Sequence, residues 1–255
     1  MSVKLFTHIL LANCLVILGF NLLMLLPELK VYLLDSNRRI ITGLSLYTFQ
    51  FIMTKALLKE NVFWLTDPFK LKAVWRGIIA FVIVLLLSLG LVTMLDKNSF
   101  ISIDQGDWIN FSGVFLLNSL PGAAMEEWLF RYFPVRFVHS ASFWIPANAI
   151  LIFMLLLFTL IHIPAFVFQY NTDLSSLGNI FVTGIFLFLI YFTTRNVLFT
   201  ALFHAFCNNP KFLMDSVFNW QYFYASVFAV TLAWPFIADK IAHRAASKKE
   251  HYIQE

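Results

Sequence analysis

The sequence predicts an all-α fold: a polytopic transmembrane helical bundle of about eight spans, forming a single integral-membrane domain over residues 1–255. Hydrophobic residues make up 60% of the chain and charged residues only 13%. Soluble domains carry about 25% charged residues, so this composition is typical of a protein embedded in lipid. The 30 Phe residues suit packing between helices and at the membrane interface better than they suit any one chemistry.

The apolar residues are gathered into segments long enough to cross a bilayer. The first segment, residues 5–26, is too long for a signal-peptide core, and the following Pro-Glu-Leu-Lys offers no small-residue cleavage site, so we expect a retained span. Residues 60–73 mix aromatic residues with lysines, a pattern of the membrane interface. Pro121 and Gly122 are expected to kink the fourth span. The remaining predicted spans are residues 40–58, 74–95, 108–137, 143–168, 178–193, 196–215 and 219–238.

The distribution of Lys and Arg between these segments predicts the orientation. With the amino terminus inside, 13 of the basic residues fall in inner segments and 5 in outer loops. Cytoplasmic loops of membrane proteins carry an excess of Lys and Arg, so we expect both termini, including a basic tail over residues 239–255, to be cytoplasmic. Orientation explains the net charge of +4 better than nucleic-acid binding does.

The fourth predicted span contains the most unusual residues of the chain, Glu126, Glu127 and Arg131. A charged residue at the centre of a span is unfavourable by about 2.5–3.5 kcal/mol, so such a cluster indicates a function. Glu127 and Arg131 stand at i and i+4, where they share a helix face and can pair. Glu126 points about 100° away. We therefore expect Glu127 and Arg131 to support the site and Glu126 to be available for chemistry.

Two further spans carry polar residues at apolar positions. His162 lies deep in the fifth span, and Pro164 beyond it removes a backbone donor, which favours a polar pocket. His204 and Asn208 stand at i and i+4 on the seventh span and can face one site. Each alone could be a structural hydrogen bond between helices. Three separate helices that bring such groups into apolar runs favour a functional site.

These groups are suited to amide hydrolysis inside a membrane. A carboxylate and a neutral imidazole can activate a water, and a second imidazole with a carboxamide can donate hydrogen bonds to the oxyanion. The alternative is zinc bound by Glu126, His162 and His204. Because the ligands are dispersed over three helices and Glu127 is expected to pair with Arg131, we favour a mechanism without cofactor. The helical zinc motif His-Glu-x-x-His and the serine motif Gly-x-Ser-Gly are both absent from the sequence.

The three motifs also resemble a known family. Glu126-Glu127-x-x-x-Arg131, Phe158-x-x-x-His162 and His204-x-x-x-Asn208 match, in order, the motifs of the CPBP (Abi) intramembrane proteases, which include the Ras-converting CAAX endopeptidase and bacteriocin-linked proteins. The resemblance implies a protease core at about 108–215. It also implies that Glu126 and His162 activate water and that His204 and Asn208 stabilise the oxyanion.

The same resemblance implies a membrane-associated protein or peptide as substrate, in contact with the bilayer. CAAX-type members often carry a second His just beyond the Phe-x-x-x-His motif, where this chain reads Ile-Pro-Ala-Phe-Val-Phe, so a prenylated substrate is less well supported. The rival hypothesis is a non-catalytic immunity or scaffold protein on the same fold. Against it, every motif position carries a residue competent for catalysis.

Overall fold

The computed structural model describes residues 1–102, 108–140, 146–165, 176–208, 217 and 220–253, with no side-chain description at residue 176 or from residue 240 onward. The regular structure in these ranges is helical, apart from a bridge between Phe100 and Val217. The predicted all-α bundle is therefore confirmed.

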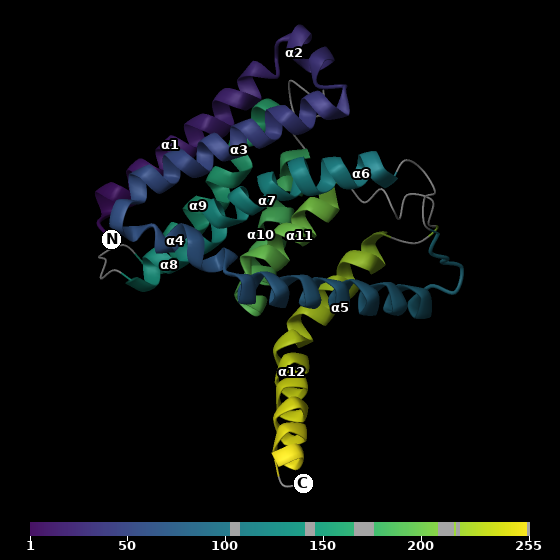
Figure 1. The fold of residues 1–255 in the computed structure, drawn as a ribbon. Coiled ribbons are helices and arrows are strands. Elements are labelled where there is room, and N and C mark those ends of the chain that lie inside the picture. The colour runs from purple at the N-terminus through teal and green to yellow at the C-terminus, as the bar shows by residue number, and fades with distance from the viewer. Residues whose placement is uncertain (103–107, 141–145, 166–175, 209–216, 218–219, 254–255) are drawn as a thin grey trace.

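Each predicted span contains a helix (Figure 1). The α-helices are α1 (Val3–Leu23), α2 (Pro27–Tyr32), α3 (Ser36–Leu58), α4 (Phe63–Thr66), α5 (Leu71–Leu95), α6 (Trp108–Val114), α7 (Leu120–Glu127), α8 (Phe133–Ser140), α9 (Ala147–Ile161), α10 (Ser176–Thr194), α11 (Val197–Asn208) and α12 (Trp220–Ile253). The interfacial segment folds into α4 between two 3-10 turns, η1 (Lys59–Asn61) and η2 (Asp67–Phe69).

Five described helices are long and apolar enough to cross a membrane: Val3–Leu23, Ser36–Asn61, Leu71–Leu95, Leu177–Thr194 and Trp220–Asp239. Helices α9 and α11 are apolar but shorter. Residues 141–145, 166–168 and 209–215, which we had included in the predicted spans or core, lie outside the described residues. The apolar span of α12 ends at Asp239, and the helix continues into the predicted basic tail as far as Ile253.

Helix ends follow side-chain caps that hydropathy does not reveal. The hydroxyl of Ser2 accepts a hydrogen bond from the Leu5 amide at 3.2 Å, so α1 begins before the predicted span. The carboxylate of Asp35 accepts one from the Arg38 amide at 2.9 Å and starts α3. Such caps satisfy amide groups that have no partner inside the helix.

The acidic pair lies on one helical run from Trp108 to Ser140, in which π-helical turns η3 (Phe115–Ser119) and η4 (Trp128–Tyr132) separate α6, α7 and α8. Pro121 follows the first of these turns, near the start of α7. A proline ring clashes with the carbonyl four residues earlier in a regular α-helix, and the wider π-turn relieves that clash. The expected kink is therefore a π-turn in a helix that does not break.

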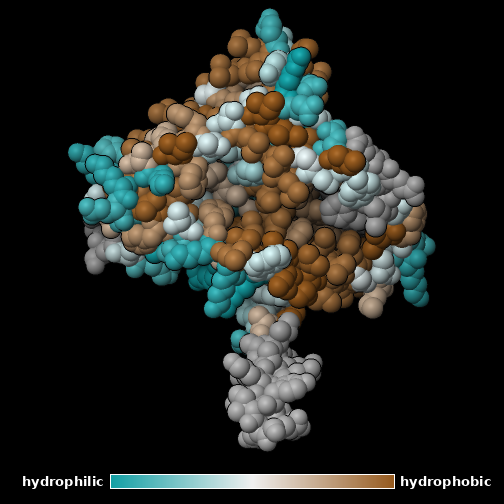
Figure 2. Space-filling model, in the orientation of Figure 1, coloured by the Kyte–Doolittle hydropathy of each residue, from teal (hydrophilic) through white to brown (hydrophobic). Residues whose placement is uncertain are grey.

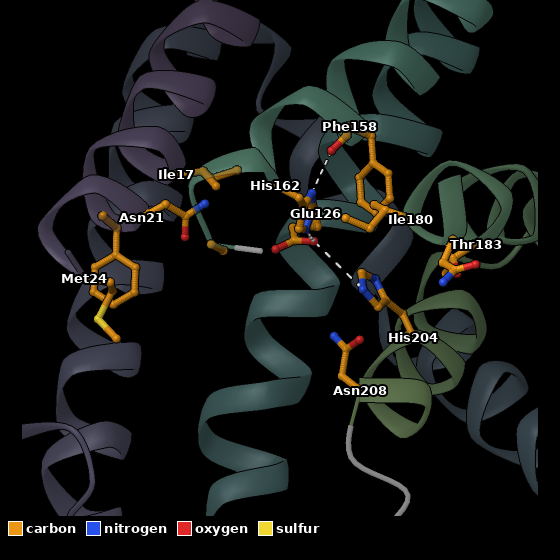
Figure 3. A pocket seen from close by; sticks show the side chains of 13 residues that line it. Ile17, Asn21, Met24, Glu126, Phe158, His162, Ile180, Thr183, His204 and Asn208 are labelled. Carbon is orange, nitrogen blue, oxygen red and sulfur yellow. Dashed lines mark hydrogen bonds and ion pairs between the residues drawn. The ribbon is translucent and has the colours of Figure 1, made fainter. Parts of the chain in front are cut away.

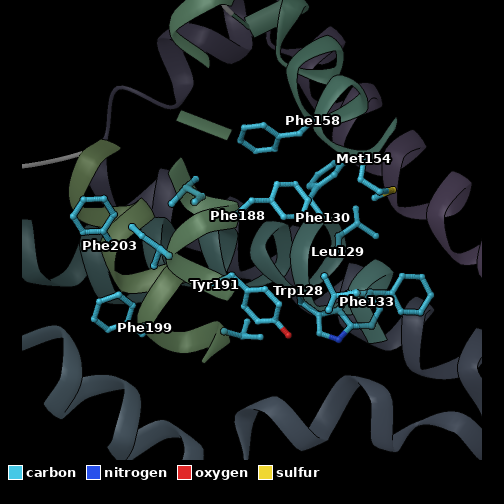
Figure 4. Packing of buried hydrophobic residues seen from close by; sticks show 14 of the residues in the cluster. Trp128, Leu129, Phe130, Phe133, Met154, Phe158, Phe188, Tyr191, Phe199 and Phe203 are labelled. Carbon is cyan, nitrogen blue, oxygen red and sulfur yellow. The ribbon is translucent and has the colours of Figure 1, made fainter. Parts of the chain in front are cut away.

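Aromatic and aliphatic side chains fill the centre of the bundle around η4 (Figure 4). Trp128, Phe130 and Phe133 have no exposed surface. The indole Nε1–H of Trp128 donates to the carbonyl of Trp64 at 2.8 Å, so its one polar atom is satisfied inside the apolar core. This packing fixes the helical turn that follows the acidic pair.

Outside this core the surface is hydrophobic over much of the face in Figure 2, and hydrophilic side chains gather toward its edges. Many large apolar side chains of α1, α3 and α5 are exposed, including Leu15, Phe49 and Leu86. Contiguous exposed apolar surface of this extent indicates contact with lipid. The protein is an integral membrane protein.

Helix α11, which carries two of the site residues, is held against α5 at a close crossing. Asn196 donates from Nδ2 to the Ala73 carbonyl at 2.8 Å and accepts at Oδ1 from the Phe199 amide at 2.9 Å. A Cβ atom on Gly77 would lie 2.6 Å from Oδ1 of Asn196 and 3.1 Å from the amide nitrogen of Phe199. Gly77 therefore permits the approach that fixes the start of α11.

Candidate active site

Three helices of the bundle bring the four predicted catalytic residues to one cavity. Glu126 lies near the end of α7, His162 is the C-cap of α9, and His204 and Asn208 lie on α11. All four line a cavity of about 610 Å³ (Figure 3). The structure thus brings together residues that are far apart in the sequence.

Glu126 lies between the two imidazoles. Its Oε2 atom is 3.7 Å from Nε2 of His162 and 4.0 Å from Nε2 of His204. The Glu126 side chain is 24% exposed, the His162 side chain 18% and the His204 side chain 6%. The carboxylate and both Nε2 atoms therefore meet at the wall of a cavity that a small molecule such as water can reach.

The expected pairing of Glu127 with Arg131 is confirmed by a distance of 3.0 Å between Oε1 and Nη1, with both side chains buried. The same Oε1 atom is 2.8 Å from Nδ1 of His204. This third partner could not be predicted from the sequence, because the contact depends on how α7 packs against α11. Glu127 therefore connects the buried guanidinium to one of the site's imidazoles.

Hydrogen bonds at Nδ1 determine which ring nitrogen of each imidazole faces the cavity. Nδ1 of His162 lies 2.6 Å from the carbonyl oxygen of Phe158, which can only accept, so this nitrogen carries a proton. Nδ1 of His204 likewise donates to the Glu127 carboxylate. In each ring Nε2 is then the atom directed at Glu126.

The end of α9 explains why the Phe158 carbonyl can accept this bond. The backbone amide of His162 bonds to Thr159 at 3.2 Å instead of reaching back to Phe158. The carbonyl of Ile161 accepts from Nδ2 of Asn21 on α1 at 3.2 Å. A helix end leaves carbonyls without intrahelical partners, and here side chains of the site occupy them. The polar pocket predicted near Pro164 is formed in this way.

The ring of Phe158 lies among the charged and titratable groups. The guanidinium carbon of Arg131 is 4.1 Å from its centroid, and the His162 and His204 rings are 4.6 Å and 6.2 Å away. The buried cation thus rests on an aromatic face as well as on Glu127. In the sequence, Phe158 is recognisable only as a motif position.

Two further walls of the cavity were not predicted as part of the site. The end of α1 contributes Asn21 and Met24, which lie across from Glu126 in Figure 3. Helix α10 contributes Asn179 and Thr183. The polar residues at i and i+4 on α10 are the sequence signal that could have indicated this wall.

In the described ranges, no group of three or more His, Cys, Asp or Glu side chains is arranged to hold a metal ion. Ligands at about 2.0 Å from a tetrahedral zinc lie about 3.3 Å apart. The separations of 3.7 and 4.0 Å between Glu126 and the imidazoles are longer. No catalytic step is therefore derived through a metal.

Comparison with known proteins gives one family match. Residues 108–209 match the family model described as type II CAAX prenyl endopeptidase Rce1-like. No curated protein and no solved structure gives a significant match. The matched region contains α7, α9 and α11 with all of the motif residues. Over residues 108–209, the chain is similar to the CAAX-type proteases.

Proposed function

We propose that this protein is an intramembrane endopeptidase that hydrolyses a peptide bond of a membrane-associated substrate with a water activated by Glu126 and His162. The observation that carries the proposal is the 3.7 Å approach of Glu126 Oε2 to His162 Nε2 on one cavity wall. A carboxylate and a neutral imidazole are both proton acceptors, so a water beside them is held by its two hydrogens.

In the first step the water oxygen forms a bond to the carbonyl carbon, and its proton passes to Glu126 or His162. The tetrahedral intermediate then collapses as the C–N bond breaks, and the same proton passes to the leaving amine. The products are a carboxylic acid and an amine. The bond between Nδ1 of His162 and the Phe158 carbonyl holds the imidazole with Nε2 toward the water throughout.

His204 and Asn208 are proposed to stabilise the oxyanion. Because Nδ1 of His204 already donates to Glu127, Nε2 can donate to the oxyanion only if both ring nitrogens carry protons. A carboxylate at Nδ1 stabilises such an imidazolium. Glu127 would therefore act as a positioning residue for His204, and Asn208 would supply a neutral donor from the end of α11.

No metal or organic cofactor takes part in this proposal. Every proton transfer is carried by side chains that already face the cavity, and Arg131 balances the charge of Glu127. The substrate is proposed to be tethered to the bilayer, because the cavity lies between helices that contact lipid.

The test is cleavage of membrane-tethered peptides, with and without a lipid anchor, by the purified protein in vesicles. We expect Glu126→Gln to lose at least about 100-fold in rate, since general acid–base catalysis contributes about 10²–10⁴-fold. Glu60→Gln is the matched control, because Glu60 is exposed on η1 and does not line the cavity. Equal rates for wild type and Glu126→Gln would contradict the mechanism, and a non-catalytic protein would cleave neither peptide.

A further inference from the structure

One face of α1 forms a wall of the active-site cavity. Ile17, Phe20, Asn21 and Met24 all line the cavity, and they stand at i, i+3, i+4 and i+7, which places them on one face of the helix. Asn21 is the polar member of the four. The matched residues 108–209 do not include α1, so this wall lies outside the part of the chain that is similar to known proteases.

The carboxamide of Asn21 connects this wall to the end of α9, and its side chain points from α1 toward His162 in Figure 3. Its Nδ2 atom donates to the carbonyl oxygen of Ile161 at 3.2 Å. That carbonyl belongs to the same planar peptide unit as the backbone N–H of His162. A hydrogen bond at Ile161 therefore acts on the backbone from which the His162 side chain starts.

The end of α9 departs from a regular helix at this point. The helix ends at Ile161, and the N–H of His162 donates to the Thr159 carbonyl at 3.2 Å. The Nδ1 atom of His162 is bonded to the Phe158 carbonyl at 2.6 Å. Both of these bonds lie within α9 and move with it. The bond from Asn21 comes from another helix, so it fixes the turn relative to α1.

Helix α1 can serve as a support because it is attached to the bundle at two earlier points. Near its start the ring of Phe6 stacks on Phe137 of α8, with centroids 4.0 Å apart. Further along, Nδ2 of Asn13 donates to Oγ1 of Thr54 on α3 at 3.0 Å, and both side chains are buried. Asn21 thus ties the end of α9 to a helix that is itself held in place.

The position of His162 is critical for the proposed chemistry. Its Nε2 atom is 3.7 Å from Oε2 of Glu126, and both groups must contact the same water. A misplacement of about 1 Å can cost about 100-fold in rate. A hydrogen bond between membrane helices, in contrast, contributes little to stability. A tether at Ile161 is therefore expected to affect the rate more than the stability of the fold.

We propose that Asn21 is a positioning residue for catalysis, which holds the peptide unit between Ile161 and His162 and so places the His162 imidazole beside Glu126. This rests on the proposed peptidase activity. It makes α1 a functional part of the active site, although α1 contributes no group to the proposed proton transfers.

The experiment compares Asn21→Leu with Asn13→Leu, using the membrane-tethered peptides and thermal unfolding in detergent. Leu has nearly the size of Asn and removes the donor, so in Asn21→Leu we expect kcat to fall by about 10- to 100-fold, with KM changed by less than about threefold. Asn13→Leu is the same exchange on the same helix, at a buried position outside the cavity. It should lower the melting temperature more than Asn21→Leu does and keep kcat. An equal loss of kcat in both variants would overturn the proposal.

Nitrogen NMR of the protein with isotope-labelled histidine supplies a readout independent of catalysis. The ring signals of His162 are assigned by their loss in His162→Ala. In wild type and in Asn13→Leu we expect one tautomer, with the proton on Nδ1, because the Phe158 carbonyl accepts from that atom. In Asn21→Leu the turn is released from α1, and the signals should shift toward a mixture of tautomers.

The two readouts separate this proposal from the proposed function. A change in the His162 signals that is specific to Asn21→Leu supports the positioning role even if no peptide is cleaved. A Glu126-dependent peptidase in which Asn21→Leu alters neither kcat nor the signals would overturn that role and leave the peptidase proposal standing. In an active peptidase, a loss of kcat without a change in the signals, or the reverse, would also overturn it.

Discussion

Two carboxylate–guanidinium ion pairs lie in different surroundings, one buried and one partly exposed. The surroundings decide how much each pair contributes to the stability of the fold. Glu127 and Arg131 are enclosed, and within the described residues Oε2 of Glu127 and Nε and Nη2 of Arg131 have no hydrogen-bond partner. Asp67 and Arg136, 3.3 Å apart, are about one third exposed. A buried ion that loses its partner is left without water, whereas an exposed one is rehydrated.

We expect Glu127→Gln to lower the free energy of unfolding by about 3–5 kcal/mol, because Arg131 becomes an uncompensated buried charge. Asp67→Asn should cost only about 0–1 kcal/mol. Thermal unfolding in detergent at neutral pH measures both. A melting temperature of Glu127→Gln equal to that of wild type would contradict the assignment of a buried pair.

The contribution of Asp67 to the stability of the fold is also expected to depend on pH. Hydrogen bonding and charge from Lys70, and then charge from Arg136, hold the pKa of the Asp67 carboxyl below its ordinary 3.8. A lowered pKa in the folded state means that the stabilisation is complete above about 3.9 and is lost as the pH falls through the folded value. The difference between wild type and Asp67→Asn should therefore be constant from pH 5 to pH 7 and disappear in stronger acid.

Metal independence is a further prediction that rests on single residues. Because Glu126 and the two imidazoles are spaced more widely than zinc ligands, we expect full activity after exhaustive chelation. Elemental analysis of the purified active protein should find less than one metal ion per chain. Stoichiometric zinc that is removed together with activity, and restored with it, would reverse this prediction, and His162→Ala should then lose the metal.

At the scale of elements, the position of α11 determines where His204 and Asn208 lie. Helix α11 begins at an Asn196 cap that also binds the Ala73 carbonyl of α5, at the crossing that Gly77 permits. Its other contacts include α7, which carries the acidic pair. The distance between Glu126 and His204 therefore depends on a crossing formed at the start of α11, well before His204 in the sequence.

Gly77→Ala is expected to destabilise the protein and to lower activity. The added Cβ would meet a side-chain oxygen at 2.6 Å and a backbone nitrogen at 3.1 Å, so α11 must shift. Overpacking of this kind typically costs about 1–3 kcal/mol. Gly90→Ala on the same helix is the matched control, because a Cβ there meets nothing within 4 Å. Comparable melting temperatures and rates for the two variants would contradict the role given to the crossing.

At the scale of the whole molecule, the features that could be predicted from the sequence are those that depend on the identity of single residues. The eight apolar segments each contain a helix, and Glu126, His162, His204 and Asn208 were singled out because polar groups are rare in such segments. The contact between Glu127 and His204, the π-turn before Pro121 and the wall formed by α1 were missed. They depend on how helices pack, and neither hydropathy nor i,i+4 spacing contains that information.

The arrangement of the helices also predicts which membrane face the active-site cavity opens to. Its lining includes Asn21 and Met24 at the end of α1, Ala165 just beyond α9, Asn179 near the start of α10 and Asn208 at the end of α11. If successive spans alternate in direction, these positions lie at the same end of the bundle, opposite the amino terminus. If the excess of basic residues keeps both termini in the cytoplasm, the substrate reaches the cavity from the outer face.

Single-cysteine variants in a Cys14→Ala and Cys207→Ala background test this with a membrane-impermeant maleimide. Leu34→Cys, at an exposed position between α2 and α3, should be labelled in intact cells. Ser247→Cys, in the basic tail, should be labelled only after permeabilisation. The maleimide reaches both positions once the membrane is opened, which controls for the reactivity of the two cysteines. The reverse pattern would place the opening of the cavity on the cytoplasmic face.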